Sequence, residues 1–214
     1  MKKLILCTLL SGVGLFAQPV SIGVIGGVPI TDAFETFQGN STYYATNTKR
    51  WLVGPTFQLN FPARISLEVD ALYRRLGYDY TLTAGPGSPV YQSTVANSWQ
   101  FPVLAKWAII PGPIRPFVDA GASFRHITGI ETIRNAINSV NQSTGTTIDT
   151  APEFNKRNDV GFTVGGGVEF KLGVLRISPE FRYTRWGSES FRDPAALLLR
   201  SNRNQGDFLL GITF

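Results

Sequence analysis

The stretch Asp159–Phe170, which reads DVGFTVGGGVEF, alternates large apolar residues with small or charged ones. Val160, Phe162 and Val164 fall on one parity of this stretch. Gly161, Thr163 and most of the remaining small or charged residues fall on the other. A period of two places successive side chains on opposite faces of a β-strand. The sequence therefore predicts an amphipathic strand with one bulky apolar face and one small, polar face.

The same period recurs in seven further segments, near 20–30, 51–61, 65–74, 98–109, 116–125, 175–183 and 207–214. Their connections alternate in length. The long ones lie near 31–48, 81–96, 129–156 and 187–205, and the short ones at 62–63, 111–113 and 172–174. This order predicts an all-β fold, an eight-stranded antiparallel up-and-down barrel. In the last long connection, Asp193 and Pro194 have the residue types that begin a helix, so one or two helical turns are expected over 193–200.

Volume decides which face of such a barrel points inward. An eight-stranded barrel has an interior just wide enough to be filled by side chains. The apolar face carries eight large rings, those of Trp51, Phe57, Trp99, Phe101, Trp107, Phe162, Phe170 and Phe181. So many rings would crowd that interior, whereas the small and polar face fits it. The sequence therefore predicts a transmembrane β-barrel with its aromatic face toward lipid.

Charged residues share the parity of the small, inner face. Seven acidic and six basic residues lie on it, so the interior charge is expected to be nearly balanced. An unpaired buried charge costs several kcal/mol, which favours pairing inside a narrow lumen. We expect an interior polar network that includes Glu68, Asp70, Lys106, Asp119, Glu169, Arg176, Glu180 and Arg182.

The first residues have the pattern of a secretory signal peptide. Met1, Lys2 and Lys3 form a positive start, an apolar stretch follows, and Ala17 offers a small residue for cleavage. We expect residues 1–17 to be removed and residues 18–214 to form the barrel domain. Cleavage would remove Cys7, the single cysteine, so the mature chain would have no disulfide. An exported chain with scattered basic residues is not expected to bind nucleic acid, despite the formal net charge of +5.

Two other residue types carry expectations about the strands. Aromatic residues near strand ends predict girdles at the headgroup level, namely Tyr43, Tyr44, Tyr73, Tyr78, Tyr80, Tyr91, Tyr183 and Trp186. Pro55, Pro102 and Pro179 lie inside strands of a sheet that has no free edge, so bulges or locally wet positions are expected there.

The segment Phe208-Leu209-Leu210-Gly211-Ile212-Thr213-Phe214, together with the signal peptide and the eight strands, resembles the small outer-membrane β-barrels of the OmpA/OmpX-like group. That resemblance implies an outer-membrane location with lipid around the barrel. It also implies that the row Phe208, Leu210, Ile212 and Phe214 is the C-terminal assembly signal read by the barrel assembly machinery.

Residues that carry chemistry are scarce. The mature chain has no thiol and no metal-ligand spacing, and Gly165–Gly167 lacks the Lys-Ser/Thr of a phosphate-binding loop. We therefore expect no catalytic, metal or cofactor site. The preferred function is a structural or surface-interaction role, in which four long extracellular loops displayed on a narrow barrel contact an extracellular ligand.

Two alternatives stay open. His126, the single histidine, shares a face with Thr128 and precedes Glu131, an arrangement weakly similar to the His-x-Ser pattern of barrels that deacylate lipid A. A lipid-modifying enzyme centred on His126 is the first alternative, although a histidine contacting headgroups has the same pattern. A soluble exported barrel that carries an apolar ligand is the second.

Overall fold

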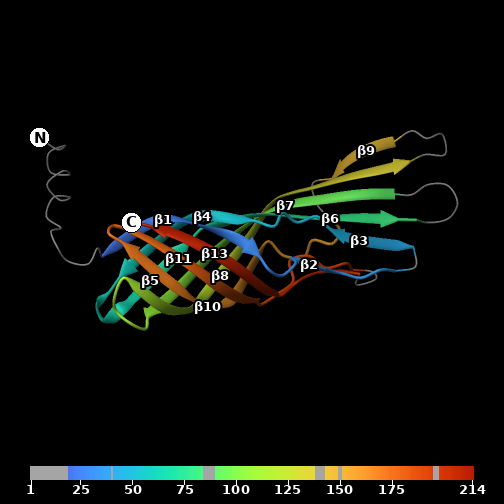
Figure 1. Ribbon diagram of the computed structural model, residues 1–214. Helices are drawn as coiled ribbons and strands as arrows, with labels where there is room; N and C mark the ends of the chain where they lie inside the picture. Colours follow the sequence, from blue (N-terminus) through green and yellow to red (C-terminus); the bar gives the residue numbers. More distant parts are fainter. Residues whose placement is uncertain (1–18, 40, 84–89, 138–142, 149–150, 195–197) are drawn as a thin grey trace, which may run out of the picture.

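The computed structural model describes residues 19–39, 41–83, 90–137, 143–148, 151–194 and 198–214, and the expected signal peptide lies outside them. Eight antiparallel barrel strands close into a barrel, one of them made of two consecutive segments (Figure 1). They are β1 (Val20–Pro29), β4 (Leu52–Asn60), β5 (Ile65–Asp70) continued by β6 (Leu72–Leu82), β7 (Val90–Ala108), β8 (Ile114–Ile137), β10 (Asn158–Leu172), β11 (Leu175–Trp186) and β13 (Asn204–Thr213). Each barrel strand pairs with the barrel strands that precede and follow it in the sequence. The predicted eight-stranded up-and-down barrel is confirmed.

Closure of the barrel depends on its first and last strands. β1 pairs with β4 on one side and with β13 on the other, from Gly23 opposite Thr213 to Pro29 opposite Asp207. At the end of this ladder the backbone N–H of Phe214 donates to the carbonyl of Ile22, 3.0 Å between N and O. The backbone polar groups of both terminal strands are thereby paired, which the hydrocarbon region of a bilayer requires.

The three strand prolines are accommodated without a shift in the pairing register. Pro55 lies on β4 beside the point where β5 gives way to β6, and its carbonyl accepts the N–H of Ala71 at 3.1 Å. The pairing register runs without interruption past Pro102, opposite Ser123, and past Pro179, opposite Leu210. The register is likewise unbroken on both sides of Pro55, so the bulges expected at the three prolines are absent.

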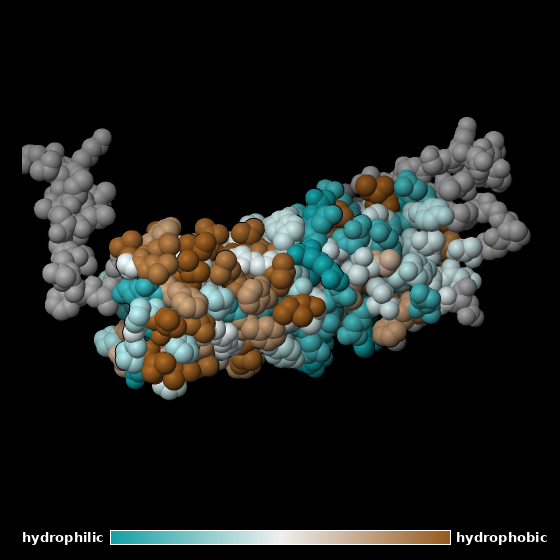
Figure 2. Space-filling model, viewed as in Figure 1, coloured by the Kyte–Doolittle hydropathy of each residue, from teal (hydrophilic) through white to brown (hydrophobic). Residues whose placement is uncertain are grey.

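The bulky face of the barrel points outward. Phe162 is 59% exposed, and the other seven aromatic rings of the predicted lipid face are exposed as well. Figure 2 shows hydrophobic residues covering the barrel end of the molecule, followed by a hydrophilic zone toward the opposite end. The interior positions are small, polar or charged and are buried. This arrangement contradicts the soluble alternative, because that alternative requires the apolar face to line the lumen.

Beyond this apolar zone the barrel continues as a sheet. β7 and β8 have 19 and 24 residues, about twice the roughly 9–11 residues that span a bilayer. β3 (Thr42–Thr46) pairs with β6 and β9 (Ser143–Ile148) with β8, giving the order β3-β6-β7-β8-β9. We call these five strands, beyond the barrel, the extracellular sheet, after the side on which the long loops are expected from the sequence (Figure 1).

Two of the four expected long loops are therefore largely strand. Residues 90–96 and 129–137 continue β7 and β8. Buried and exposed side chains still alternate along most of these residues, although polar residues, threonine among them, replace many of the bulky apolar ones. A second, two-stranded sheet joins β2 (Phe34–Thr36) to β12 (Leu199–Ser201). The expected helical turn over 193–200 is wrong at Leu199 and Arg200, which pair with β2, while 195–197 lie outside the described residues.

The three expected short turns are confirmed, and the first contains the 3₁₀-helix η1 (Pro62–Arg64). β8 bulges at Gly129, whose φ of +55° lies in the left-handed region that glycine adopts without strain. The register of β7 against β8 shifts at this point, between Val95 and Asn97. No helix in the described part of the chain is long and apolar enough to cross a membrane.

Candidate functional site

A buried cluster of charges fills the middle of the barrel. Arg182 on β11 forms ion pairs with Glu68, Asp70 and Glu180, and its Nη1 lies 2.5 Å from Asp70 Oδ2. Lys106 on β7 pairs with Glu68 and lies 3.7 Å from Glu180 Oε2. With Asp119 on β8, which lies opposite Lys106 in the register, these six residues come from four different strands. We call them the interior charge cluster.

Charge in this cluster is not balanced. Four carboxylates face two cations, and both Asp119 carboxylate oxygens are buried without a hydrogen-bond partner among the described residues. The near balance expected from counting parities therefore does not hold within the cluster, because parity places a charge on the inner face without fixing its height along the barrel axis. Asp119 is the acid left outside the ion pairs.

The other two members of the predicted network lie nearer the short turns. Glu169 pairs with Arg115, a residue that the sequence analysis did not select. Arg176 is buried, and its Nη1 lies 3.5 Å from Asn60 Oδ1. The structure thus brings six of the eight predicted residues into one cluster and leaves two near one end of the lumen.

A second interior layer lies toward the extracellular sheet. Arg125 pairs with Asp159 at 2.8 Å, and its guanidinium lies 4.2 Å from the ring centroid of Trp186. The indole N–H of Trp186 donates to Gln205 Oε1 at 3.0 Å, and Gln205 exchanges hydrogen bonds with Gln100. Trp186 is fully buried, so the expectation that it belongs to an aromatic girdle is wrong.

The third layer is an apolar core inside the extracellular extension, centred on one buried carboxylate. Glu153 accepts hydrogen bonds from the hydroxyls of Tyr44 at 3.1 Å and Tyr78 at 2.9 Å. Apolar residues from five strands and two loops pack around them, including Phe34, Leu76, Ala96, Ile127, Ile130, Ala151, Phe191 and Leu199. Burial, followed by the negative charge of Glu153, raises the pKa of Tyr44 well above its usual value of 10.0, so its hydroxyl remains a donor.

Tyr44 and Tyr78 were expected in the girdle, and both are buried in this core instead. Glu153 was not selected at all. Strand parity carried the signal for Tyr78, because Leu72, Arg74 and Leu76 precede it on the inner face of β6. For Glu153 no local signal exists, since its partners lie 75 and 109 residues away.

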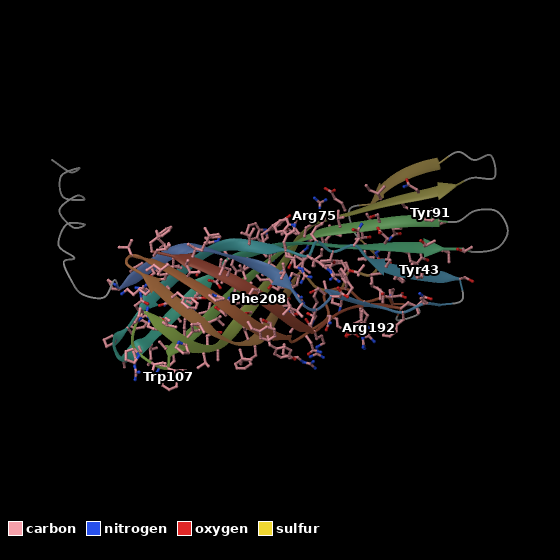
Figure 3. The ribbon with its side chains drawn as sticks, in the orientation of Figure 1. Tyr43, Arg75, Tyr91, Trp107, Arg192 and Phe208 are labelled. Atoms are coloured by element: carbon pink, nitrogen blue, oxygen red, sulfur yellow. The ribbon has the colours of Figure 1, made fainter. Side chains whose placement is uncertain are left out.

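The outer face of the extracellular sheet carries two exposed tyrosines, Tyr43 and Tyr91 (Figure 3). Tyr183, a further exposed tyrosine, lies on barrel strand β11. The pairing register places Tyr43, Thr81, Tyr91 and Asn135 side by side on four successive strands. Tyr43 and Tyr91 are 47% and 45% exposed. Two aromatic rings therefore lie in one row on the exposed outer face of this sheet.

His126 lies on the outside of β8, between Trp99 and Asn158 in the register. Its Nδ1 is 2.5 Å from Asn158 Oδ1, and the hydrogen bonds of the described residues give it no carboxylate partner. The bulge at Gly129 turns the strand between Thr128 and Glu131. Within the described residues, no three His, Cys, Asp or Glu side chains are grouped so that they could hold a metal ion.

Comparison with known proteins gives one family and several related folds. The family model described as outer membrane protein beta-barrel domain matches residues 16–187, whereas no curated protein sequence matches the chain. The outer membrane protein OprG from Pseudomonas aeruginosa is 13% identical with a TM-score of 0.49, over 91% of this chain and 94% of its own.

Two further solved structures are similar. The Neisserial surface protein A is 10% identical with a TM-score of 0.40, over 93% of this chain and 98% of its own. Ail, the attachment invasion locus protein of Yersinia pestis, is 11% identical with a TM-score of 0.37, over 91% of this chain and 94% of its own. Since the family match spans most of the sequence and agrees with the closed barrel and its apolar outer face, the chain belongs to the outer membrane protein beta-barrel domain family and is located in the outer membrane.

Proposed function

We propose that this protein is a structural outer-membrane barrel that holds a rigid β-sheet at the cell surface, where the sheet contacts an extracellular ligand. The observation that supports the proposal is the sheet itself. β6, β7 and β8 continue beyond the apolar zone, where β3 and β9 pair with them, instead of ending in irregular loops. Three successive layers of side chains occupy the lumen beneath it. A filled barrel of this width serves as an anchor better than as a channel.

Two features make the extracellular sheet suitable for contact with a partner. Tyr43 and Tyr91 supply large, rigid rings with a polar hydroxyl, and tyrosine is enriched at the energetic centres of protein interfaces. β3 and β9 are the outermost strands of the five-stranded order. The edge of β3 is partly occupied by the bridge between Gln38 and Tyr43, so β9 is the strand that presents a backbone edge. Exposed strand edges can pair with an added strand of another chain.

Two partners within the cell envelope complete the proposal. The exposed aromatic and aliphatic rows of the barrel contact the acyl chains of the outer membrane, as the hydrophobic effect requires of so much apolar surface. The row Phe208, Leu210, Ile212 and Phe214 is exposed along β13, where the barrel assembly machinery can read it before β1 and β13 pair.

Single cysteines test the placement of the sheet. The mature chain is expected to lack cysteine, so Tyr91→Cys and Ala63→Cys each add one thiol, the first on the sheet and the second in a short turn. In intact cells, a membrane-impermeant maleimide should label only the Tyr91→Cys variant. Both variants should react once the envelope is opened. Labelling of Ala63→Cys alone in intact cells would reverse the orientation and refute the proposal.

Adhesion tests the contact role. Cells that produce the protein should be retained on surfaces coated with collagen or with heparin in larger numbers than cells that carry an empty vector. The double variant Tyr43→Ser/Tyr91→Ser should lose that difference, while Trp107→Leu, on the lipid face far from the sheet, should keep it. Equal retention with and without the protein would remove the surface-interaction role.

We propose no catalytic role for His126, because the neutral amide of Asn158 is its side-chain partner. A hydrolytic triad of the serine-hydrolase type needs a carboxylate to orient the imidazole and stabilise its cation. Mass spectra of lipid A from cells with and without the protein test this assignment. Identical spectra are expected, and loss of an acyl chain that disappears with His126→Ala would establish the enzyme.

A further inference from the structure

The short-turn end of the barrel holds a cavity that the proposed function does not use. Its volume is about 210 Å³, and it lies between the interior charge cluster and the short turns. Long loops of outer-membrane barrels face outward and short turns face the periplasm, so this cavity opens toward the periplasm. The charged residues that line it are Arg64, Lys106, Arg115, Glu169, Lys171 and Arg176. We call it the periplasmic cavity.

The lining of this cavity is strongly cationic. Five basic side chains face one carboxylate, Glu169. Lys106 is paired with the acids of the interior charge cluster, and Arg115 is paired with Glu169. No carboxylate of the described residues lies within ion-pair distance of the other three, Arg64, Lys171 and Arg176. A narrow cleft lined by one sign of charge concentrates the opposite ion.

Arg176 is the most informative of these residues. Its side chain is only 4% exposed, yet its Nε is buried without a hydrogen-bond partner among the described residues. Among the described residues, the hydrogen bond of its guanidinium is a long one, from Nη1 to Asn60 Oδ1 at 3.5 Å. A buried guanidinium with an unused donor costs free energy unless an acceptor completes it. Glu169, the acid whose charge acts on Arg176, is already paired with Arg115. The guanidinium is therefore only partly compensated within the protein, which favours an anion from solution.

Arg64 lies at the mouth of the cavity, in a turn with strained backbone. Ala63 and Arg64 both have φ of +64°, a conformation that costs a non-glycine residue energy and that clusters at functional positions. Arg64 Nη1 donates to the backbone carbonyl of Ile109 at 2.8 Å, across the neighbouring short turn. A neutral carbonyl fixes the position of this guanidinium and leaves its charge uncompensated.

We propose that the periplasmic cavity binds a small, multiply charged oxyanion, with Arg176 at its base and Arg64 at its mouth. Phosphate and a short polycarboxylate such as citrate share this chemistry. The volume supports the size class, because cavities that take drug-sized molecules begin at about 300 Å³, while a single water needs only about 10–15 Å³. Charge-assisted hydrogen bonds from guanidinium groups to such oxygens are the strong ones. This site is independent of the proposed surface role.

Calorimetric titration of the refolded full-length mature chain in neutral detergent tests the site, with phosphate and citrate added in separate runs at constant ionic strength. We expect saturation at one anion per chain. Arg176→Gln should weaken binding at least tenfold. Arg75→Gln removes an exposed arginine in the middle of the molecule, away from the cavity, and should leave the affinity unchanged (Figure 3).

Folding of each variant is checked by its faster migration on a gel before boiling. If Arg176→Gln does not fold, the exposed Arg64→Gln decides, with at least threefold weaker binding expected. The proposal is overturned by the absence of saturable heat with both anions, or by wild-type affinity in the folded cavity variants. It is equally overturned if Arg75→Gln weakens binding as much as the cavity variants, since that result would reflect net charge alone.

Discussion

Asp119 and Gly165 face each other across the ladder of β8 and β10, and a Cβ atom on Gly165 would lie 2.6 Å from Asp119 Oδ1. The same atom would lie 2.9 Å from the backbone carbonyl oxygen of Phe181 and 3.0 Å from Arg182 Cγ, both on β11. Gly165 is thus the space that lets an acidic and a basic side chain flank one strand position inside the lumen. The glycine is needed here for close approach and not for backbone freedom.

Gly165→Ala should therefore destabilise the barrel. Crowding a filled interior costs roughly 1–3 kcal/mol, because neighbouring side chains must leave their preferred rotamers. The measurement is the urea midpoint of refolding into detergent micelles. Gly206→Ala is the matched control, since its added methyl would meet only ordinary contacts at 3.6 and 3.7 Å. A wild-type midpoint for Gly165→Ala would show that Asp119, Arg182 and the backbone at Phe181 can move apart without cost.

Arg182 should be the most sensitive residue of the interior charge cluster. It binds three carboxylates, so Arg182→Gln leaves them with Lys106 alone and should cost about 3–5 kcal/mol, the range for removing one partner of a buried pair. Glu180→Gln removes one of several acids that share two cations and should cost less, about 1–3 kcal/mol. Urea midpoints of the two variants check this order. The reverse order would contradict the central position of Arg182.

Asp119 should respond in the opposite sense. Its carboxylate accepts no hydrogen bond among the described residues and adds a fourth negative charge beside two cations. Asp119→Asn keeps the shape and removes the repulsion, so the free energy of unfolding should stay the same or rise. The same urea titration measures it. A loss comparable with that of Glu180→Gln would mean that Asp119 is held by contacts that outweigh its charge.

Glu153 should control the extracellular extension without affecting the barrel. Glu153→Ala leaves the hydroxyls of Tyr44 and Tyr78 buried without an acceptor, at a cost of about 1–3 kcal/mol. The loops that contact this core should open, and trypsin should then cut at the exposed Lys156 and Arg157. Limited proteolysis followed by an unheated gel should show nicked chains that still migrate as folded barrels. Unchanged cleavage rates would show that packing alone holds the core.

Most of the barrel could be predicted from local sequence. Alternation placed Phe162 outside and Thr163 inside, and the narrow lumen of an eight-stranded barrel decided which face was which. Parity also placed Glu68, Lys106 and Arg182 on the inner face. It did not give their heights along the axis, because stagger between strands depends on the register of every pair. The unequal charge around Asp119 was hidden for that reason.

The extracellular sheet was less predictable, because no lipid imposes a bulky outer face there. Residues 90–96 are polar enough to be taken for a loop, although their alternation continues through Gln92, Thr94 and Ala96 on the inner side. The core around Glu153 depends on chain segments that meet only after the barrel closes. Polarity alone could not separate such a sheet from four mobile loops.

Phe214 offers a test that separates recognition from stability. Its ring is exposed on the lipid side, while its backbone makes the last hydrogen bonds to Ile22. Phe214→Ala keeps those backbone bonds and removes little packing, so refolding from urea into detergent should remain close to that of the wild type. If the β13 row is read by the assembly machinery, the amount of folded barrel in the outer membrane of cells should fall several-fold.

Phe162→Ala is the matched control, because it removes an equally exposed ring from the lipid face of another strand. It should lower the two measurements to the same small extent. Comparing folded protein from cells with refolding yield in vitro gives a ratio for each variant. A ratio reduced only for Phe214→Ala supports recognition of the row. Equal ratios for the two variants would mean that the aromatic residue acts through lipid contact alone.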